Sequence, residues 1–129
     1  MMAPMVVAYL AFNALLYAVF AAWCAVAPEQ TSTFLGLKSS NPAGASEYLA
    51  VYGGLQAGLA VFYALAARLP VHRRTAVVFS LALYGGIVVM RTVAAVTLGF
   101  GELGNARLAY ALELALLLAA VLLARRKTR

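Results

Sequence analysis

Four long apolar runs follow one another along the chain, separated by polar or basic stretches. The runs cover residues 4–27, 46–67, 75–98 and 105–124. Each run reaches or exceeds the roughly 20 apolar residues that a helix needs to cross a bilayer. Hydrocarbon accommodates only helices and closed barrels, and these runs are too long and too continuous for barrel strands. The pattern therefore predicts an all-α integral membrane protein, with four spans in a single domain covering residues 1–129.

Composition excludes an ordinary soluble domain. Hydrophobic residues make up 65% of the chain and charged residues only 11%, whereas about 25% of the residues in an average soluble protein are charged. The first run carries no charge and ends in Ala25-Val26-Ala27, a pattern that resembles a signal-peptide cleavage site. Because no basic segment precedes it and it is far longer than a signal core of about 7–15 residues, we expect it to be retained as a span.

The basic residues predict the orientation. They gather between the second and third runs, at Arg68, His72, Arg73 and Arg74, and after the fourth run, at Arg125, Arg126, Lys127 and Arg129. With four spans, both clusters lie on one side, and the positive-inside rule makes that side the cytoplasm. We therefore expect a multi-pass protein of the bacterial inner membrane with both termini inside. The same clustering at span ends argues against nucleic acid as a partner for the net charge of +6.

Every run has one polar stripe when its residues are plotted at 100° per residue. The stripes contain Tyr9, Asn13, Tyr17, Phe20 and Cys24; Tyr52, Gln56, Leu59 and Tyr63; Ser80, Tyr84, Val88, Arg91 and Ala95; and Tyr110, Glu113, Leu117 and Ala120. The opposite faces are mainly Ala, Val and Leu. Turning the four stripes toward one another buries them in an antiparallel four-helix bundle with short connections.

Three polar residues share one depth in this bundle. Counted from the same end of their runs, Arg91 is the eighth residue, Glu113 the ninth and Gln56 the eleventh, so we expect all three about 12–16 Å below one membrane face. An Arg at the centre of a span costs about 2.5–3.5 kcal/mol, and a bidentate bond to Glu113 would offset much of that cost. The pair has two interpretations: it fixes which helices are neighbours, or it forms part of a ligand site.

The ligand-site interpretation gives a polar pocket in the outer half of the bundle. Its candidate residues are Arg91, Glu113, Gln56, Tyr17, Tyr52, Tyr84, Tyr110, Asn13 and Glu47. Glu47 lies opposite Gln56 on its helix, so we expect it to pair with Arg107 or Lys38 instead of joining the central cluster. Tyr9, Tyr48 and Trp23 lie near the predicted interfaces, where aromatic belts form without any ligand.

Small residues predict close helix contacts. Tyr52-Gly53-Gly54 recurs as Tyr84-Gly85-Gly86, and Gly54 with Gly58 forms a small-xxx-small pair. Such residues allow helices to approach closely in membranes, either within the bundle or between two copies. A homodimer through Gly54 and Gly58 is therefore one predicted assembly. Asn41 or Ser46 is expected to cap the second helix, and Asn105 the fourth.

No cofactor or metal is expected from the sequence. His72 and Cys24 are the single residues of their kinds, which excludes the usual His and Cys metal sets. Phosphate-loop and hydrolase motifs are absent.

From Ser46 onward the chain resembles a family of uncharacterised bacterial four-span membrane proteins, catalogued as a domain of unknown function, number 4345. The matching residues are Ser46-Glu47-Tyr48, Tyr52-Gly53-Gly54, Gly85-Gly86, Arg91 and Glu113. Members often carry a basic residue soon after the acid of the second helix, where this chain has Leu49 and Ala50, so the role of Glu47 stays open. The resemblance implies a topology and no activity.

Four functions follow from these observations. The leading one is binding of a membrane lipid or small amphipathic molecule, with Arg91 engaging an acidic or phosphate headgroup. The second is transport of a small molecule or ion by two assembled copies, against which the mostly apolar inner half argues. The third is a structural or accessory subunit of a membrane complex. The last is a small membrane enzyme, such as an isomerase with one acid and one base, although no spacing requires it.

Overall fold

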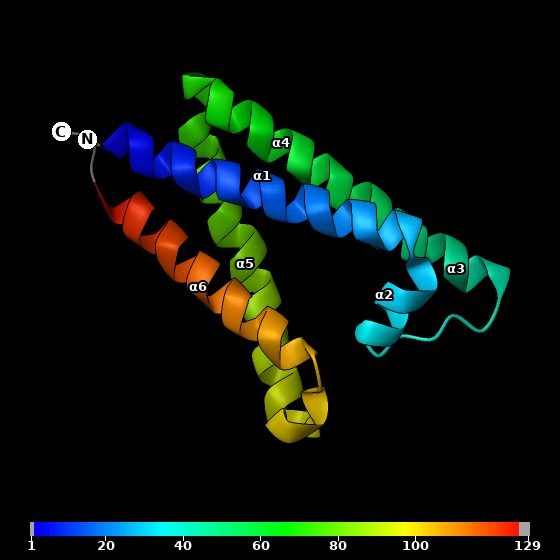
Figure 1. Ribbon diagram of the computed structural model, residues 1–129. Coiled ribbons are helices and arrows are strands. Elements are labelled where there is room, and N and C mark those ends of the chain that lie inside the picture. Colours follow the sequence, from blue (N-terminus) through cyan, green and yellow to red (C-terminus); the bar gives the residue numbers. More distant parts are fainter. Residues whose placement is uncertain (1, 127–129) are drawn as a thin grey trace.

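The computed structural model describes residues 2–126 and contains only helices and connections in that range. The elements are α1 (Met2–Val26), α2 (Pro28–Phe34), α3 (Pro42–Tyr48), the π-helix η1 (Leu49–Leu55), α4 (Gln56–Arg68), α5 (Pro70–Leu98), the 3-10 helix η2 (Phe100–Leu103) and α6 (Ala106–Arg125) (Figure 1). The predicted basic residues Lys127 and Arg129 lie outside the described range.

Four continuous helices are long and apolar enough to cross a membrane, which confirms the all-α prediction. They cover Ala3–Val26, Pro42–Arg68, Pro70–Leu98 and Ala106–Arg125. The protein is therefore a multi-pass membrane protein. The second of these helices is α3, η1 and α4 joined without a break, so the π-helical turn lies inside a span.

The four spans form two pairs that diverge. α1 packs along η1 and α4, which we call the first pair, and α5 packs along α6, the second pair. The pairs meet toward the end of the molecule that carries both termini, here the basic end, and separate toward the end that carries α2, α3 and η2, here the loop end (Figure 1). The predicted closed bundle is thus correct for the basic half, whereas the loop half is open.

The helix boundaries depend on prolines and capping residues, which a hydropathy pattern does not reveal. α5 begins at Pro70, five residues before the predicted start of the run, because Leu69 is extended and proline favours the first helical position. Asn41 caps α3 as predicted, since its Oδ1 accepts a hydrogen bond from the Gly44 backbone N–H at 2.8 Å. Asn105 occupies the N-cap position of α6 as predicted, but its side chain makes no capping bond: its Nδ2 donates to the Phe34 carbonyl at 2.9 Å.

That Asn105 bond joins α2 to the start of α6. α2 lies in the polar stretch between the first two predicted runs. Pro28 begins it, and the Thr31 hydroxyl donates to the Ala27 carbonyl at 3.0 Å. The Tyr48 hydroxyl also donates to Thr31 Oγ1 at 2.7 Å. α2 is therefore fixed to both pairs at the loop end, and it crosses the opening between them.

The glycines do not make the close contacts predicted within the chain, with one exception. A Cβ on Gly53 would lie 3.9 Å from the Ala25 side chain. At Gly54, Gly58, Gly85 and Gly86 no neighbouring helix approaches within 4 Å. The core instead uses alanines, and Ala60, Ala66, Ala76 and Ala120 are buried where helices meet.

Candidate functional site: a polar cleft between the helical pairs

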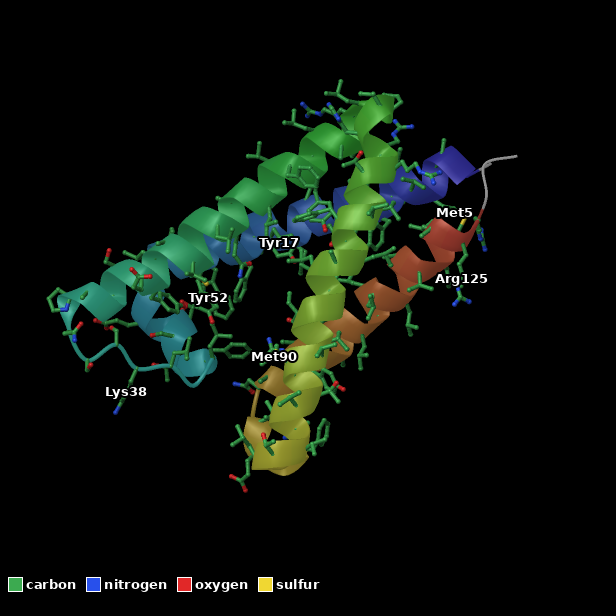
Figure 2. All side chains as sticks on the ribbon, turned by 180° about the vertical axis from the view of Figure 1, so that it is seen from behind. Met5, Tyr17, Lys38, Tyr52, Met90 and Arg125 are labelled. Atoms are coloured by element: carbon green, nitrogen blue, oxygen red, sulfur yellow. The ribbon has the colours of Figure 1, made fainter. Side chains whose placement is uncertain are left out.

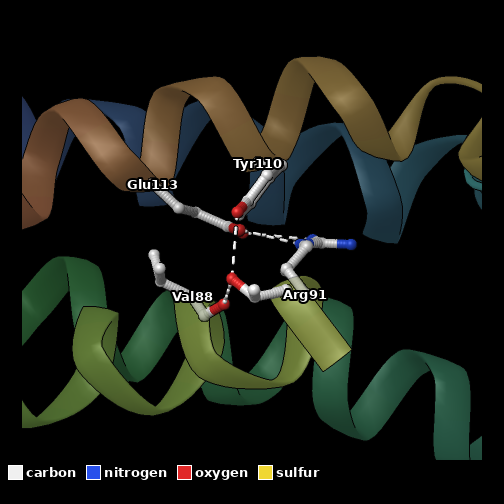
Figure 3. Close-up of polar contacts among 5 residues, drawn as sticks. Val88, Arg91, Tyr110 and Glu113 are labelled. Carbon is white, nitrogen blue, oxygen red and sulfur yellow. Dashed lines mark hydrogen bonds and ion pairs between the residues drawn. The ribbon is translucent and has the colours of Figure 1, made fainter. Parts of the chain in front are cut away.

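The site is built on an ion pair between α5 and α6. Arg91 donates from Nε to Glu113 Oε2 at 2.8 Å and from Nη2 to Glu113 Oε1 at 3.1 Å (Figure 3). Arg91 lies seven residues before the end of α5 and Glu113 seven residues after the start of α6, so both lie about 10 Å inside their helices. Matching depth and length allow the bidentate geometry that the sequence predicted.

The ion pair is only partly shielded. The Arg91 side chain is 32% exposed and the Glu113 side chain 16%. The third guanidinium nitrogen of Arg91, Nη1, has no hydrogen-bond partner among the described residues. Figure 3 shows the outer part of the guanidinium pointing away from Glu113. The pair is thus internally satisfied and still presents N–H donors to whatever lies beside it.

A cleft of about 340 Å³ lies beside this pair, between the two helical pairs. Six of the predicted site residues line it: Tyr17, Tyr52, Gln56, Tyr84, Arg91 and Glu113. The remaining walls are mainly apolar, and Leu35 and Leu37, which follow α2, lie at its loop-end boundary. Figure 2 shows Tyr17 and Tyr52 on the first pair, across the opening from the second. Six of the nine predicted pocket residues thus meet at one cleft, in the loop half of the molecule.

The π-helical turn shapes one wall of the cleft. η1 carries Tyr52, whose ring stacks on Tyr48 with centroids 4.8 Å apart. A π-helical turn bonds each residue to the fifth along, and so changes the direction of the side chains that follow it. The Tyr48 side chain points back to α2, whereas Tyr52 and Gln56 line the cleft. Such turns are frequent at functional sites, and hydropathy gave no signal of this one.

Below the cleft, a chain of hydrogen bonds closes the space between the pairs. The Tyr17 hydroxyl donates to the Tyr84 hydroxyl at 3.0 Å, and the Tyr84 hydroxyl donates to Asn13 Oδ1. Asn13 Nδ2 donates to the Tyr9 carbonyl at 2.8 Å, and the Tyr9 hydroxyl to the Leu116 carbonyl at 3.1 Å. All four polar side chains are buried, so the cleft has a solid polar floor.

A second buried contact lies farther toward the basic end. The hydroxyls of Tyr63 and Ser80 are 2.8 Å apart, and Ser80 Oγ also donates to the Ala76 carbonyl at 2.8 Å. The inner half, which the sequence predicts to be mostly apolar, thus also contains this polar contact. Tyr9, which the sequence placed near an interface, is buried in the core and bonded to the Leu116 carbonyl. The signal was present, because Tyr9 and Ser80 lie on the polar stripes of their helices.

Three of the predicted site residues do not line the cleft. Asn13 lies beneath it in the floor. Tyr110 contacts Thr92 across α5 and α6, with the hydroxyls 2.9 Å apart (Figure 3). Glu47 is exposed at the loop end, away from the cleft.

The predicted ion pairs of Glu47 are not formed. Within residues 2–126 the one ion pair is that of Arg91 with Glu113. Arg107, one of the expected partners, instead donates from Nε to the Gly104 carbonyl at 3.2 Å and lies 5.9 Å from the centre of the Phe100 ring.

Within the described part of the chain, no three His, Cys, Asp or Glu side chains lie together as a metal site.

Comparison with known proteins identifies the family and no activity. No curated protein and no solved structure matches the chain. A family model does match, over residues 5–124, and its description is Domain of unknown function (DUF4345). The match covers both helical pairs and the whole cleft, and the chain belongs to this family.

Proposed function

We propose that this protein binds a lipid or another small amphipathic molecule in the cleft between the two helical pairs. The observation that carries the proposal is the partly exposed ion pair of Arg91 and Glu113, which opens into an otherwise mainly apolar hollow. The cleft volume of about 340 Å³ falls within the range of known small-molecule sites, about 300–1,000 Å³. Apolar walls with a few convergent polar groups are the usual composition of such sites.

The N–H donors of Arg91 that are not bonded to Glu113 determine which kind of headgroup the cleft would bind. Glu113 already neutralises the guanidinium charge, so the ligand need not carry a full negative charge of its own. It needs an oxygen acceptor within reach of Nη1, which a phosphate, carboxylate or carbonyl group supplies. Gln56 and Tyr52 on the opposite wall offer further hydrogen bonds. The leucines and alanines of the walls, among them Leu16 and Leu112, suit an acyl chain.

Exposure of the ion pair favours binding over a purely architectural role. Partial exposure keeps N–H donors of Arg91 within reach of a ligand, whereas a fully buried pair could contact none. Here one third of the Arg91 side chain is open. Polar or charged side chains at such depth are functional candidates by default.

Transport would require a path through the floor of the cleft. Tyr17, Tyr84 and Asn13 are buried there and hydrogen-bonded to one another. A solute could pass only if this network opened. Binding in the cleft does not require this network to open, so the geometry favours binding over transport.

Native mass spectrometry of the purified protein tests the proposal. The wild type is expected to retain one amphipathic ligand of defined mass. The double variant Arg91→Leu/Glu113→Leu removes both charges together, so that no unpaired charge remains in the membrane. Ala109→Phe fills the cleft with a side chain and leaves the ion pair in place. Both variants are expected to lose the ligand.

The matched control is Arg107→Leu. Arg107 is an exposed arginine at the loop end that does not line the cleft, so its replacement is expected to leave ligand retention unchanged. Equal retention by the wild type and by folded Arg91→Leu/Glu113→Leu and Ala109→Phe would overturn the proposal. Loss of ligand in all three variants, Arg107→Leu included, would show nonspecific adsorption and would also reject it.

A further inference from the structure

A second hollow lies at the basic end, at the opposite end of the helices from the cleft. Its volume is about 360 Å³, and it is formed by the beginning of α1, the beginning of α5 and the end of α6. We call it the basic crevice. Its lining includes the arginines Arg73, Arg74 and Arg126 and the apolar side chains Val6, Val77, Val78 and Leu123. Figure 2 marks this end of the molecule by Met5 and Arg125.

No acidic residue balances these arginines. The chain has four acidic residues, and Glu29, Glu47, Glu102 and Glu113 lie in α2, α3, η2 and the loop half of α6. Two further arginines, Arg68 and Arg125, add to the positive charge at the basic end. Mutual repulsion among these cations favours an anion between them.

The arginines of the crevice also have donors without strong acceptors. Arg73 Nη2 donates to the Ala67 carbonyl at 3.1 Å, but Arg73 Nε is buried and has no partner among residues 2–126. Arg126 Nη1 lies 3.2 Å from the Met5 sulfur, which is a weak acceptor. An oxygen anion in the crevice would supply the acceptors that these groups lack, with a turn of the Arg73 side chain to reach it.

The apolar floor indicates which anion fits. Val6, Val77 and Leu123 are nearly buried beneath the arginines, whereas the side chain of Val78 is 56% exposed. A free inorganic anion would gain nothing from this surface. A phospholipid would place its acyl chain against the valines and its phosphate among the guanidinium groups, at the depth where helix ends meet headgroups. Basic pockets between spans are known to bind anionic headgroups in this way.

We infer that the basic crevice binds an anionic phospholipid from the leaflet at the basic end, with its phosphate held by Arg73, Arg74 and Arg126. This inference does not depend on the function proposed for the cleft, because the two hollows share no residue. It assigns Arg73, Arg74 and Arg126 a binding role in addition to the predicted role of the basic clusters in orientation.

The experiment compares two double variants with equal loss of charge. Arg74→Gln/Arg126→Gln removes two arginines of the crevice, and Arg68→Gln/Arg125→Gln removes two exposed arginines of the same end that do not line it. Each protein is placed in nanodiscs of phosphatidylcholine with a minor fraction of phosphatidylglycerol. Native mass spectrometry then reports how strongly phosphatidylglycerol is enriched on the protein. All measurements are repeated in the Arg91→Leu/Glu113→Leu background, so that a ligand of the cleft cannot account for the signal.

The wild type and Arg68→Gln/Arg125→Gln are expected to enrich phosphatidylglycerol equally, and Arg74→Gln/Arg126→Gln to lose about tenfold or more of that preference. Val78→Trp, which fills the apolar part, is expected to lose it as well. Equal losses in the two arginine pairs would show only a diffuse attraction and would overturn the inference. Displacement of the lipid by millimolar inorganic phosphate would assign the crevice to a free anion and reject the phospholipid. Persistence of enrichment in Val78→Trp would show that the lipid binds outside the crevice and would also overturn the inference.

Discussion

In the basic half of the molecule, Asn13, Tyr84 and Ser80 are fully or almost fully buried, and each makes a hydrogen bond to another residue of the core. In the loop half, Arg91 and Gln56 are partly exposed in the wall of a cleft. The same four helices therefore treat their polar side chains in two ways. Near the basic end these side chains join the helices together, and near the loop end they stay available to another molecule.

This difference separates structural from functional polar groups in one small membrane protein. A buried amide or hydroxyl that already has its partners contributes stability and costs about 1–3 kcal/mol when a partner is left unsatisfied. A polar group that has no partner within the chain contributes little stability, and its presence in a span calls for a different explanation. Stability measurements and binding measurements are thus expected to respond to different halves.

The largest expected effect on stability comes from replacing a buried amide of the basic half by leucine. Asn13→Leu removes the acceptor of the Tyr84 hydroxyl and the donor to the Tyr9 carbonyl. We expect the free energy of unfolding to fall by about 2–3 kcal/mol, measured as thermal or denaturant unfolding in detergent. Gln56→Leu is the matched change in the loop half, where the amide has no hydrogen-bond partner within the described chain. The free energy of unfolding of this variant should stay within about 0.5 kcal/mol of the wild-type value. Equal losses in the two variants would remove the distinction between the halves.

The next effect concerns the ion pair. Glu113→Leu leaves Arg91 unpaired in the membrane and should destabilise the protein by about 1–2 kcal/mol, less than a fully buried pair because Arg91 is partly exposed. Adding Arg91→Leu should restore most of that stability, as a double-mutant cycle measures. Ligand retention should stay lost. A double variant that binds ligand normally would make the ion pair purely architectural.

A smaller effect is expected at the loop end, where α2 is fixed to both helical pairs. Thr31→Val removes the acceptor of the Tyr48 hydroxyl, leaving only the weak contact of that hydroxyl with Cys24 at 3.5 Å. We expect a loss of about 1 kcal/mol and faster hydrogen exchange confined to α2. Thr33→Val, an exposed neighbour that bonds only to the Glu29 carbonyl, is the control. Unchanged exchange in Thr31→Val would mean that α2 is held by other contacts.

The smallest effect on stability belongs to the outer faces. Gly58 is exposed, and no atom lies within 4 Å of an added Cβ. Gly58→Leu should leave the free energy of unfolding within about 0.5 kcal/mol of the wild-type value. The homodimer predicted through Gly54 and Gly58 should shift to monomer in this variant, as light scattering after size-exclusion chromatography reports. Gly86→Leu, equally open, should not change the mass. A dimer that survives Gly58→Leu would exclude this surface as its interface.

The spans and the ion pair could be predicted from the sequence because each depends on one helix at a time. Hydropathy defines a span, and counting residues from its end defines the depth of Arg91 and Glu113. The polar stripes likewise predicted the burial of Asn13 and Tyr84. These features need no knowledge of how the helices are arranged.

The features that could not be predicted from the sequence depend on contacts between segments that are distant along the chain. The bond of Tyr84 to Asn13, and the burial of Tyr48, follow from how the pairs meet, which periodicity does not encode. The divergence of the two pairs and the π-helical turn at η1 are of the same kind. α2 was missed because its seven residues, Pro28–Phe34, are rich in Thr and Ser, which favour caps and turns in isolation. Glu47 was placed among the candidates by its charge alone, and the structure leaves it exposed.

The most direct test of this account is a structure of the protein determined in lipid nanodiscs at a resolution that reveals bound lipid. Elongated density should fill the space between the two helical pairs, with its polar end at Nη1 of Arg91 and the bond to Glu113 intact. Two pairs packed against each other along their full length, with no space beside Arg91, would contradict it.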